Sequence, residues 1–408
     1  MNSCIARQPI FNKDKTVFGY ELLYREKGID DYTEIDGDKA TLNVMKDSFL
    51  SVGMETLTGN KKAFVNFTER LITEEIASLF SNEHMVIELL ETIEPSEEVV
   101  AACKNLKKAG YPIVLDDFVL RDDYEPLILL ADIIKLDFLN TPIKENKEII
   151  KKYGDMGIKF LAEKIETIED FNLAIDLGCT YFQGYFFAKP EVLPSRTILP
   201  YKLSYLRLIN AMYEEDPDFD EIAEIIEHDV SFSYEVLKLV NSAAFYKRNT
   251  IHSIKQAIVF MGIEGIKKWV YLAVSKKVTG NKKPNEIINY SMIRLKFMEQ
   301  MAERLGENKR KSEYITVGML SLMDALMDME MTAILQAIHL SEDIKNTLMG
   351  NNPKDKMSIA YQLILKYERG DIDQLSHLCS LLQLEIDEVS QMYYHALDWL
   401  NGILDSNN

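Results

Sequence analysis

The chain has 408 residues, 47% apolar and 27% charged as in folded globular proteins, and is too long for one ordinary core, so we expect two domains. Acidic residues outnumber basic ones by 65 to 46, and the formal charge of −19 disfavours binding to a nucleic-acid polymer or an anionic membrane. The sequence shows no signal peptide, no run as long as a membrane span and no zinc spacing among its four cysteines, so we expect a cytoplasmic protein with unpaired thiols.

Short β-rich segments alternate with helix-like segments through the first half of the chain. The first two are close enough to form a hairpin with Asn12-Lys13-Asp14 as its turn, and the later ones begin roughly 20–27 residues apart, as βα units do. The expected strands are residues 5–11, 16–24, 63–67, 85–90, 112–118, 132–138, 159–165 and 181–187. Eight strands with helices between them predict an irregular (β/α)8 TIM-type barrel, an α/β fold, whose first two strands are antiparallel.

Three prolines, Pro190, Pro194 and Pro200, interrupt this pattern and indicate a linker, which places one domain at residues 1–195 and a second at residues 196–408. After the linker, apolar residues recur at helical spacing, which predicts an all-α domain. The expected helices are residues 220–227, 234–239, 254–274, 286–305, 314–329, 359–367 and 385–403. The Met-rich run at residues 319–331 favours a buried helix over an adaptable partner-binding surface.

Acidic, amide and lysine side chains lie at or near the ends of the expected strands. They are Glu21, Asn66, Glu88, Asp116, Asp117, Lys135 and Glu163. Taken singly, each is most often a solvated strand end or a helix cap, but their equivalent places in successive units favour one shared site at a barrel mouth. Buried carboxylates need positive partners, and the donors are all oxygens, so we expect two Mg2+ or Mn2+ ions and a phosphate-bearing ligand. There, Lys135 can neutralise a phosphoryl oxygen or orient the attacking water, and Glu163 can accept its proton.

The first domain resembles the EAL domain family, which hydrolyses the bacterial second messenger cyclic di-GMP to linear pGpG. The resemblance covers residues 5–190 and consists of several motifs in order. These motifs are Glu21-Leu22-Leu23-Tyr24-Arg25, Val65-Asn66-Phe67-Thr68, Glu88-Leu89-Leu90-Glu91, Asp116-Asp117-Phe118, Lys135-Leu136-Asp137, Ala162-Glu163-Lys164-Ile165-Glu166-Thr167 and Gln183-Gly184-Tyr185.

The resemblance also assigns roles to these residues. It implies metal ligation by Glu21, Asn66, Glu88, Asp116 and Asp117, and catalysis by Lys135 and the general base Glu163. It implies that Arg25 holds a substrate phosphate, that Glu166 contacts guanine and that Gln183 hydrogen-bonds the metal and water cluster. Glu91 corresponds to the residue that anchors a mobile loop over the site.

One segment departs from the family pattern. After the paired aspartates, active EAL domains carry Gly-Thr-Gly-Tyr-Ser-Ser, a loop that closes over the metals and helps the domain dimerise. Residues 119–124 here read Val-Leu-Arg-Asp-Asp-Tyr, so the backbone conformations that only glycine adopts cheaply are lost. Lys164 likewise replaces a glycine. The metal ligands are kept while the loop differs, which leaves turnover, loop closure and a homodimer open.

The second domain resembles the HDOD family, which is related to metal-dependent HD phosphohydrolases. The resemblance rests on Asp229, residues 237–245, residues 251–258 and Met261-Gly262. A working HD protein would read Gly-Leu-Leu-His-Asp where this chain has Gly318-Met319-Leu320-Ser321-Leu322. Serine and leucine ligate a hard metal poorly, so we expect no catalysis in this domain and assign it the binding of a protein partner.

The combination of EAL and HDOD domains resembles a class of bacterial signalling proteins. It implies a metal-dependent phosphodiesterase that hydrolyses cyclic di-GMP and has a non-catalytic output domain. The altered loop supports an alternative, in which an inactive EAL domain senses cyclic di-GMP or acts as a protein-interaction scaffold. A third hypothesis, a phosphohydrolase centred on the helical half, is disfavoured by Ser321 and Leu322.

Overall fold

The computed structural model describes residues 3–26, 54–116, 122–188, 207–214, 216–227, 236, 240, 253–279, 286–338, 340–352 and 354–405. The chain forms two compact units, Met1–Lys189 with Gln362–Asn401, and Pro190–Tyr361 with Gly402–Asn408. The second part of the chain therefore contributes residues to both units. The domain boundary between residues 195 and 196 stays a prediction, and the linker prolines lie outside the described residues.

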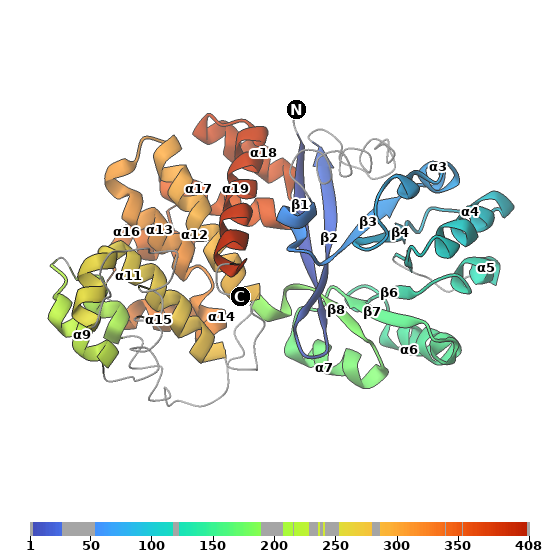
Figure 1. Cartoon of the computed structure of the whole chain (residues 1–408), viewed down its shortest axis with the longest axis horizontal. Helices are drawn as coiled ribbons and strands as arrows, with labels where there is room; N and C mark the ends of the chain where they lie inside the picture. Colours follow the sequence, from blue (N-terminus) through green and yellow to red (C-terminus); the bar gives the residue numbers. More distant parts are fainter. Residues whose placement is uncertain are drawn as a thin grey trace. The chain divides into compact units, whose positions relative to one another are not determined.

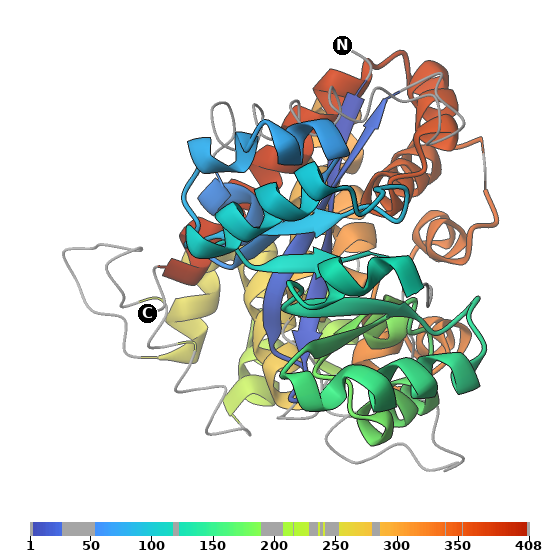
Figure 2. The ribbon, with the colours of Figure 1, turned by 90° about the vertical axis from the view of Figure 1, so that its right-hand side faces the viewer.

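The first unit contains a closed barrel of eight strands in chain order, labelled in Figure 1 and turned by 90° in Figure 2. Its strands are β1 Ser3–Asn12, β2 Val17–Glu26, β3 Lys62–Phe67, β4 Met85–Leu89, β5 Ile113–Leu115, β6 Ile133–Asp137, β7 Lys159–Glu163 and β8 Tyr181–Gln183. Strand β1 runs antiparallel to both β2 and β8, and the other neighbours are parallel. The predicted irregular TIM-type barrel with an antiparallel first pair is confirmed.

Helices connect the parallel strands on the outside of the barrel (Figure 2). They are α3 Glu69–Thr73, α4 Glu97–Lys108, α5 Glu125–Ile128, α6 Ile143–Tyr153 and α7 Ile168–Leu177, with a short α2 Met54–Thr58 before β3. Local sequence fixes their ends: Ser96 accepts a hydrogen bond from Val99 N at the start of α4, and Thr167 and Asp170 form a reciprocal capping box on α7. The helix α7 ends at Gly178, which has the left-handed φ of 103°.

The barrel interior is filled by one large apolar or aromatic side chain from each of seven strands. This layer consists of Ile10, Phe64, Val86, Val114, Ile133, Leu161 and Tyr181. Side chains two residues apart on a strand point to the same face. The next inward-pointing position on each strand therefore lies one layer nearer the barrel mouth. The core layer is thus the floor of that mouth.

Strand β8 is shorter than the sequence pattern predicted, because it ends at Gln183 rather than continuing to residue 187. Gly184 has a φ of 146°, and a Cβ atom there would lie only 2.1 Å from the carbonyl oxygen of Ile165. The backbone segments directly after β7 and β8 therefore approach each other as only a glycine permits, and the chain turns into a 3-10 helix, η5 Tyr185–Ala188.

The second unit is helical, as predicted. Its helices are α9 Phe219–Glu227, α11 Ile254–Thr279, α12 Glu286–Arg304, α13 Lys311–Leu320, α14 Met323–Met327, α15 Met331–Ala337, α16 Glu342–Met349 and the beginning of α17 Lys356–Arg369. Within α11, Gly262 has non-helical angles and separates two helices. None of the helices in the described ranges has the length and apolarity needed to cross a membrane.

The expected helix at residues 314–329 is broken in two at Ser321 and Leu322, and α15 and α16 were not expected from the pattern. Three of the five methionines of this run, Met319, Met323 and Met327, are buried, and Met329 and Met331 are partly exposed, so the interpretation as buried helix holds for the part up to Met327. Most of the expected helix at residues 234–239 lies outside the described residues.

The last helices, α18 Ile372–Leu382 and α19 Ile386–Asp405, lie with the barrel in the first unit as far as Asn401. The hydroxyl of Tyr367, near the end of α17, donates a hydrogen bond to Ile5 O of β1 at 3.2 Å. The side-chain amide of Asn401 donates to Thr56 O at 3.0 Å. Residues from the end of the chain thus complete the packing around its first strand.

Candidate active site at the barrel mouth

The candidate site is built one layer above the barrel floor. Each core residue is followed two positions later by a polar side chain: Phe64 by Asn66, Val86 by Glu88, Val114 by Asp116, Ile133 by Lys135, Leu161 by Glu163 and Tyr181 by Gln183. On the reversed strand β1 the order inverts, and Gln8 lies two positions before Ile10. The same two-residue repeat that fills the floor therefore directs these polar groups into one mouth.

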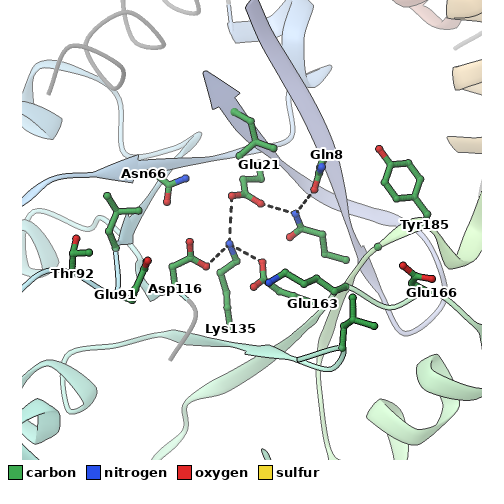
Figure 3. A pocket seen from close by; sticks show the side chains of 16 residues that line it. Gln8, Glu21, Asn66, Glu91, Thr92, Asp116, Lys135, Glu163, Glu166 and Tyr185 are labelled. Atoms are coloured by element: carbon green, nitrogen blue, oxygen red, sulfur yellow. Dashed lines mark hydrogen bonds and ion pairs between the residues drawn. The ribbon is translucent and has the colours of Figure 1, made fainter. Parts of the chain in front are cut away.

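Lys135 lies at the centre of four carboxylates, and Figure 3 shows its ion pairs with three of them, Glu21, Asp116 and Glu163. Its Nζ is 2.8 Å from Asp116 Oδ1, 2.8 Å from Glu163 Oε1, 3.2 Å from Glu88 Oε1 and 3.5 Å from Glu21 Oε1. The Lys135 side chain is 1% exposed and that of Glu88 is 0% exposed. One buried cation therefore faces four acids, which leaves the cluster formally negative when all four are ionised.

This charge imbalance shifts the pKa values of the cluster. Burial raises the pKa of Glu88 well above its usual range, since Lys135 compensates only in part and the neighbouring acids raise it further. Burial, Asp116 and Glu21 likewise raise the pKa of Glu163 to about 8, against the opposing effect of Lys135. Burial alone would lower the pKa of Lys135, but the four acids together raise it well above its ordinary value. The lysine is charged, and the excess negative charge draws protons or other cations.

Gln183 connects this cluster to the first two strands. Its Nε2 donates to Glu21 Oε2 at 2.6 Å and to Gln8 Oε1 at 3.1 Å. Gln8 and Glu21 face each other as register partners in the β1–β2 hairpin. The amide thus fixes one oxygen of Glu21 and leaves the other directed at Lys135.

The cluster opens into a cavity of about 530 Å³, a size typical of small-ligand sites. Its polar lining residues include Gln8, Glu21, Asn66, Glu91, Thr92, Asp116, Lys135, Glu163, Lys164, Glu166, Gln183 and Tyr185. Next to the cavity-lining Glu91, the Tyr124 hydroxyl lies 3.0 Å from Glu91 O and also contacts Ile93 O, which ties the last residue of the altered loop to the chain that follows β4.

The structure brings together most of the residues that the sequence singled out. Glu21, Asn66, Glu91, Asp116, Lys135, Glu163, Glu166 and Gln183 line the cavity, and Glu88 lies beneath it in contact with Lys135. Asp117 lies outside the described residues, as does the side chain of Arg25, whose backbone belongs to β2. The roles assigned to all of them stay predictions.

Sequence reasoning missed Gln8 and Tyr185. Counting back from the hairpin turn could not have found Gln8, because the register shifts between Ile10 and Phe11, and this shift pairs Gln8 with Glu21. Tyr185 is the last residue of the last motif but was given no role there, and the sharp turn at Gly184 brings it to the cavity.

A hard metal ion would need several of these side-chain oxygens as ligands. Across the described ranges, no three acidic, histidine or cysteine side chains form a ready-made metal-binding group. The ammonium of Lys135 lies among the carboxylates instead. Nevertheless, neither oxygen of the buried Glu88 accepts a hydrogen bond from the described residues, and Glu88 Oε2 has no ion pair among them. An oxygen-only set with an unsatisfied buried carboxylate fits a hard cation such as Mg2+, Mn2+ or Ca2+.

In the helical unit, Ser321 and Leu322 stand at the two positions where a working HD protein would carry His and Asp. The Ser321 hydroxyl donates to Gly318 O at 2.7 Å and accepts from Arg294 Nη1 at 3.2 Å, and Leu322 is buried. Both side chains are used in packing the junction of α13 and α14.

Comparison with known proteins agrees with this architecture. A family model for the EAL domain matches residues 49–190, and one for the HDOD domain matches residues 199–342. Over 413 residues the chain is 37% identical to "Uncharacterized protein YuxH" of Bacillus subtilis, with 100% of both chains covered. Over 402 residues it is 29% identical to "Cyclic di-GMP phosphodiesterase CdgJ" of Vibrio cholerae, covering 98% of this chain and 92% of the relative.

A solved structure of a standalone EAL protein from Vibrio cholerae O395, in its c-di-GMP-bound form, is 25% identical and covers 46% of this chain and 91% of that one, with a TM-score of 0.37. The site described above is an acidic barrel mouth with a lysine at its centre, on a barrel in which one strand is reversed. With both family models matched and a full-length relative 37% identical, the chain belongs to the family of proteins that join an EAL domain to an HDOD domain.

Proposed function

We propose that the barrel binds cyclic di-GMP at its mouth and hydrolyses it to linear pGpG with the help of divalent metal ions, while the helical domain serves as a non-catalytic output domain that binds a protein partner. The observation that carries the proposal is the convergence of Glu21, Glu88, Asp116 and Glu163 on Lys135 at the cavity floor. The full-length similarity to a relative named as a cyclic di-GMP phosphodiesterase supports the choice of substrate.

Charge balance supports the need for metal. A cyclic dinucleotide brings two phosphodiester charges to a mouth that already holds four acids and one lysine, so binding without added cations is electrostatically unfavourable. Glu21, Asn66, Glu88, Asp116 and Asp117 would hold two Mg2+ or Mn2+ ions. When bound, such ions activate a water molecule and stabilise the charge of an in-line phosphodiester displacement.

The protein's own groups would complete the reaction. Glu163 accepts one proton from the attacking water, whose oxygen bonds to phosphorus as the bond to the leaving ribose oxygen breaks. That ribose oxygen takes up a proton, which yields one terminal phosphate and one free hydroxyl. Lys135, held by the acids, contributes positive charge close to the phosphoryl oxygens. Gln183 keeps Glu21 oriented, and Arg25 and Glu166 would contact a phosphate and a guanine at the rim.

Incubation with labelled cyclic di-GMP and Mn2+, with the products separated over time, tests this function. We expect pGpG from the full chain, a rate reduced by about 100-fold or more in Glu163→Gln, and no product when EDTA removes the metal. Absence of pGpG above the level of a Glu21→Ala variant contradicts the proposed hydrolysis.

A second candidate function is a cyclic di-GMP sensor or scaffold without turnover. The placement of Lys135 among the acids favours it, since a metal must share these carboxylates with the ammonium. Tight binding of cyclic di-GMP with no pGpG after long incubation would establish the sensor, and absence of binding with and without metal would leave a role in protein interaction.

A further inference from the structure

The end of α17 contacts the barrel at two places beside the cavity. Tyr367, fully buried, donates to Ile5 O of β1, and its ring lies 4.6 Å from the ring of Tyr393 in α19. The next two residues, Glu368 and Arg369, contact Tyr185. The Tyr185 hydroxyl lies 3.5 Å from Glu368 O, and the guanidinium of Arg369 lies over the Tyr185 ring, 5.7 Å from its centroid. Three consecutive residues of one helix thus touch two parts of the barrel.

Both contact points adjoin residues of the candidate site. Ile5 lies on β1 three residues from Gln8, on the mouth side, because β1 is reversed and Ile5 pairs with Tyr24 at the end of β2. Tyr185 lines the cavity and is separated from Gln183 only by Gly184. Since β1 and β8 are hydrogen-bonded neighbours, the two points belong to one side of the mouth. Figure 3 shows Tyr185 on the same side as Gln8 and Glu166.

The backbone and the side chain of Tyr185 are held by different parts of the chain. Phe186 fixes the 3-10 turn to the barrel, because its ring stacks on Phe171 of α7 at 4.8 Å and meets the edge of Phe11 of β1 at 5.6 Å. The Tyr185 side chain contacts Glu368 through its hydroxyl and Arg369 through its ring, both at the end of α17. This helix begins in the other unit, since the division between the units falls between Tyr361 and Gln362. Helix α17 is therefore one continuous element with residues in both units.

We propose that the end of α17 forms a regulatory wall of the nucleotide pocket, in which Arg369 acts as a positioning residue that holds Tyr185 against the cavity. This inference rests on the proposed binding of cyclic di-GMP and adds to it how the helical half regulates the same site. A partner that bends or shifts α17 changes the position of Tyr185 and lowers nucleotide affinity. The metal-binding cluster lies on strands that α17 does not touch through these contacts, so metal affinity is unaffected.

The test uses the full chain with Glu163→Gln, which prevents consumption of the nucleotide, and measures cyclic di-GMP binding by calorimetry in Mn2+. Adding Arg369→Ala raises the Kd about two- to fivefold, as expected for the loss of an exposed cation–π contact, and Arg369→Lys restores most of the affinity. In a Tyr185→Leu background, Arg369→Ala has no further effect, because the contact is already gone. Binding of Mn2+ without nucleotide is the same in every variant.

A matched control and a second measurement complete the test. Lys152→Ala removes another cation over a tyrosine ring, Lys152 over Tyr153 at 5.0 Å, at the end of α6 opposite the mouth, and leaves the Kd unchanged. Hydrogen exchange without nucleotide is faster at residues 181–188 in Arg369→Ala, while residues 85–89 of β4 are unaffected.

The outcomes separate this inference from the proposed function. If the parent binds cyclic di-GMP and Arg369→Ala leaves its Kd unchanged, the regulatory wall is refuted while the proposed binding stands. An equal loss of Mn2+ affinity also refutes it, because the variant then damages the whole site. If the parent binds no cyclic di-GMP, the proposed function fails. Independently of nucleotide binding, hydrogen exchange at residues 181–188 that is unchanged in Arg369→Ala refutes the positioning role.

Discussion

The ammonium of Lys164 lies 2.5 Å from Asp137 Oδ2, joining the ends of neighbouring strands β7 and β6. Lys164 replaces the glycine of the family motif and has a φ of 56°, a left-handed conformation that is costly for lysine. Asp137 also accepts hydrogen bonds from Leu139 N and from the backbone and side-chain amides of Asn140. The ion pair thus offsets the strain of a bend that lies directly after Glu163.

Asp137→Asn should destabilise the protein in a pH-dependent way. Burial alone would raise the pKa of Asp137, but the bonds from Lys164, Asn140 and Leu139 outweigh it and lower the pKa below 3.8. The stabilisation by ionised Asp137 is therefore complete above the pKa of the unfolded state and is lost as the pH falls through the lower pKa of the folded state. We expect a loss of about 1–3 kcal/mol in the free energy of unfolding at pH 7 that shrinks toward about pH 3. Urea unfolding at several pH values measures this loss, with the exposed Asp176→Asn variant as control. A difference in unfolding free energy between wild type and Asp137→Asn that does not vary with pH would contradict the prediction.

Glu88→Gln should have opposite effects on metal affinity and on stability without metal. The variant removes a buried carboxyl whose ionisation is unfavourable there and whose oxygens accept no hydrogen bond from the described residues, so the metal-free protein should become more stable. Mn2+ affinity should fall by more than about tenfold, since even residues outside the direct ligand set typically change it that much. Thermal melts in EDTA and calorimetric titration with Mn2+ check the two halves. Loss of stability with unchanged Mn2+ affinity would rule out Glu88 as a ligand.

Glu163→Gln should change how stability depends on pH in the absence of metal. The pKa of Glu163 is raised from 4.5 to about 8, so the native state holds a proton that the unfolded state has released between these values. Stability contributed by this proton is present below pH 4.5 and is lost as the pH rises to about 8. The variant should therefore lose less stability than the wild type over this interval. Melts in EDTA with exposed Glu97→Gln as control test it, and parallel pH profiles would disprove it.

Gly184→Ala should be far more damaging than a glycine replacement elsewhere in the barrel. A Cβ atom at Gly184 would lie 2.1 Å from Ile165 O, so β7 and β8 must separate next to Gln183, and we expect a loss above about 3 kcal/mol. Gly157 provides the matched control: its φ is also positive, at 80°, but nothing lies within 4 Å, so Gly157→Ala should cost about 1 kcal/mol. Similar urea midpoints for the two variants would contradict the close approach.

Much of the barrel was predictable because its signals are local. Alternating side chains and regular spacing predict the strands, and the same two-residue repeat places Asn66, Glu88 and Lys135 at one mouth. The contacts of Lys135 with four acids were not predictable, since they depend on side chains that meet across the barrel from five strands or strand ends. The joining of residues 362–401 to the barrel was also missed, because it follows from contacts such as Tyr367 with Ile5, which leave no pattern along the chain.

The return of the chain's last helices to its first strand limits how such a protein can be recombined. A fragment truncated at residue 195 keeps every strand but exposes the surface of β1 that Tyr367 covers, together with the backbone carbonyl of Ile5 that it satisfies. Gene fusions that exchange the N-terminal half for another EAL sequence must therefore also supply a matching C-terminal segment. The barrel of this chain thus shares its compact unit with residues 362–401, even though family models divide the chain into consecutive modules.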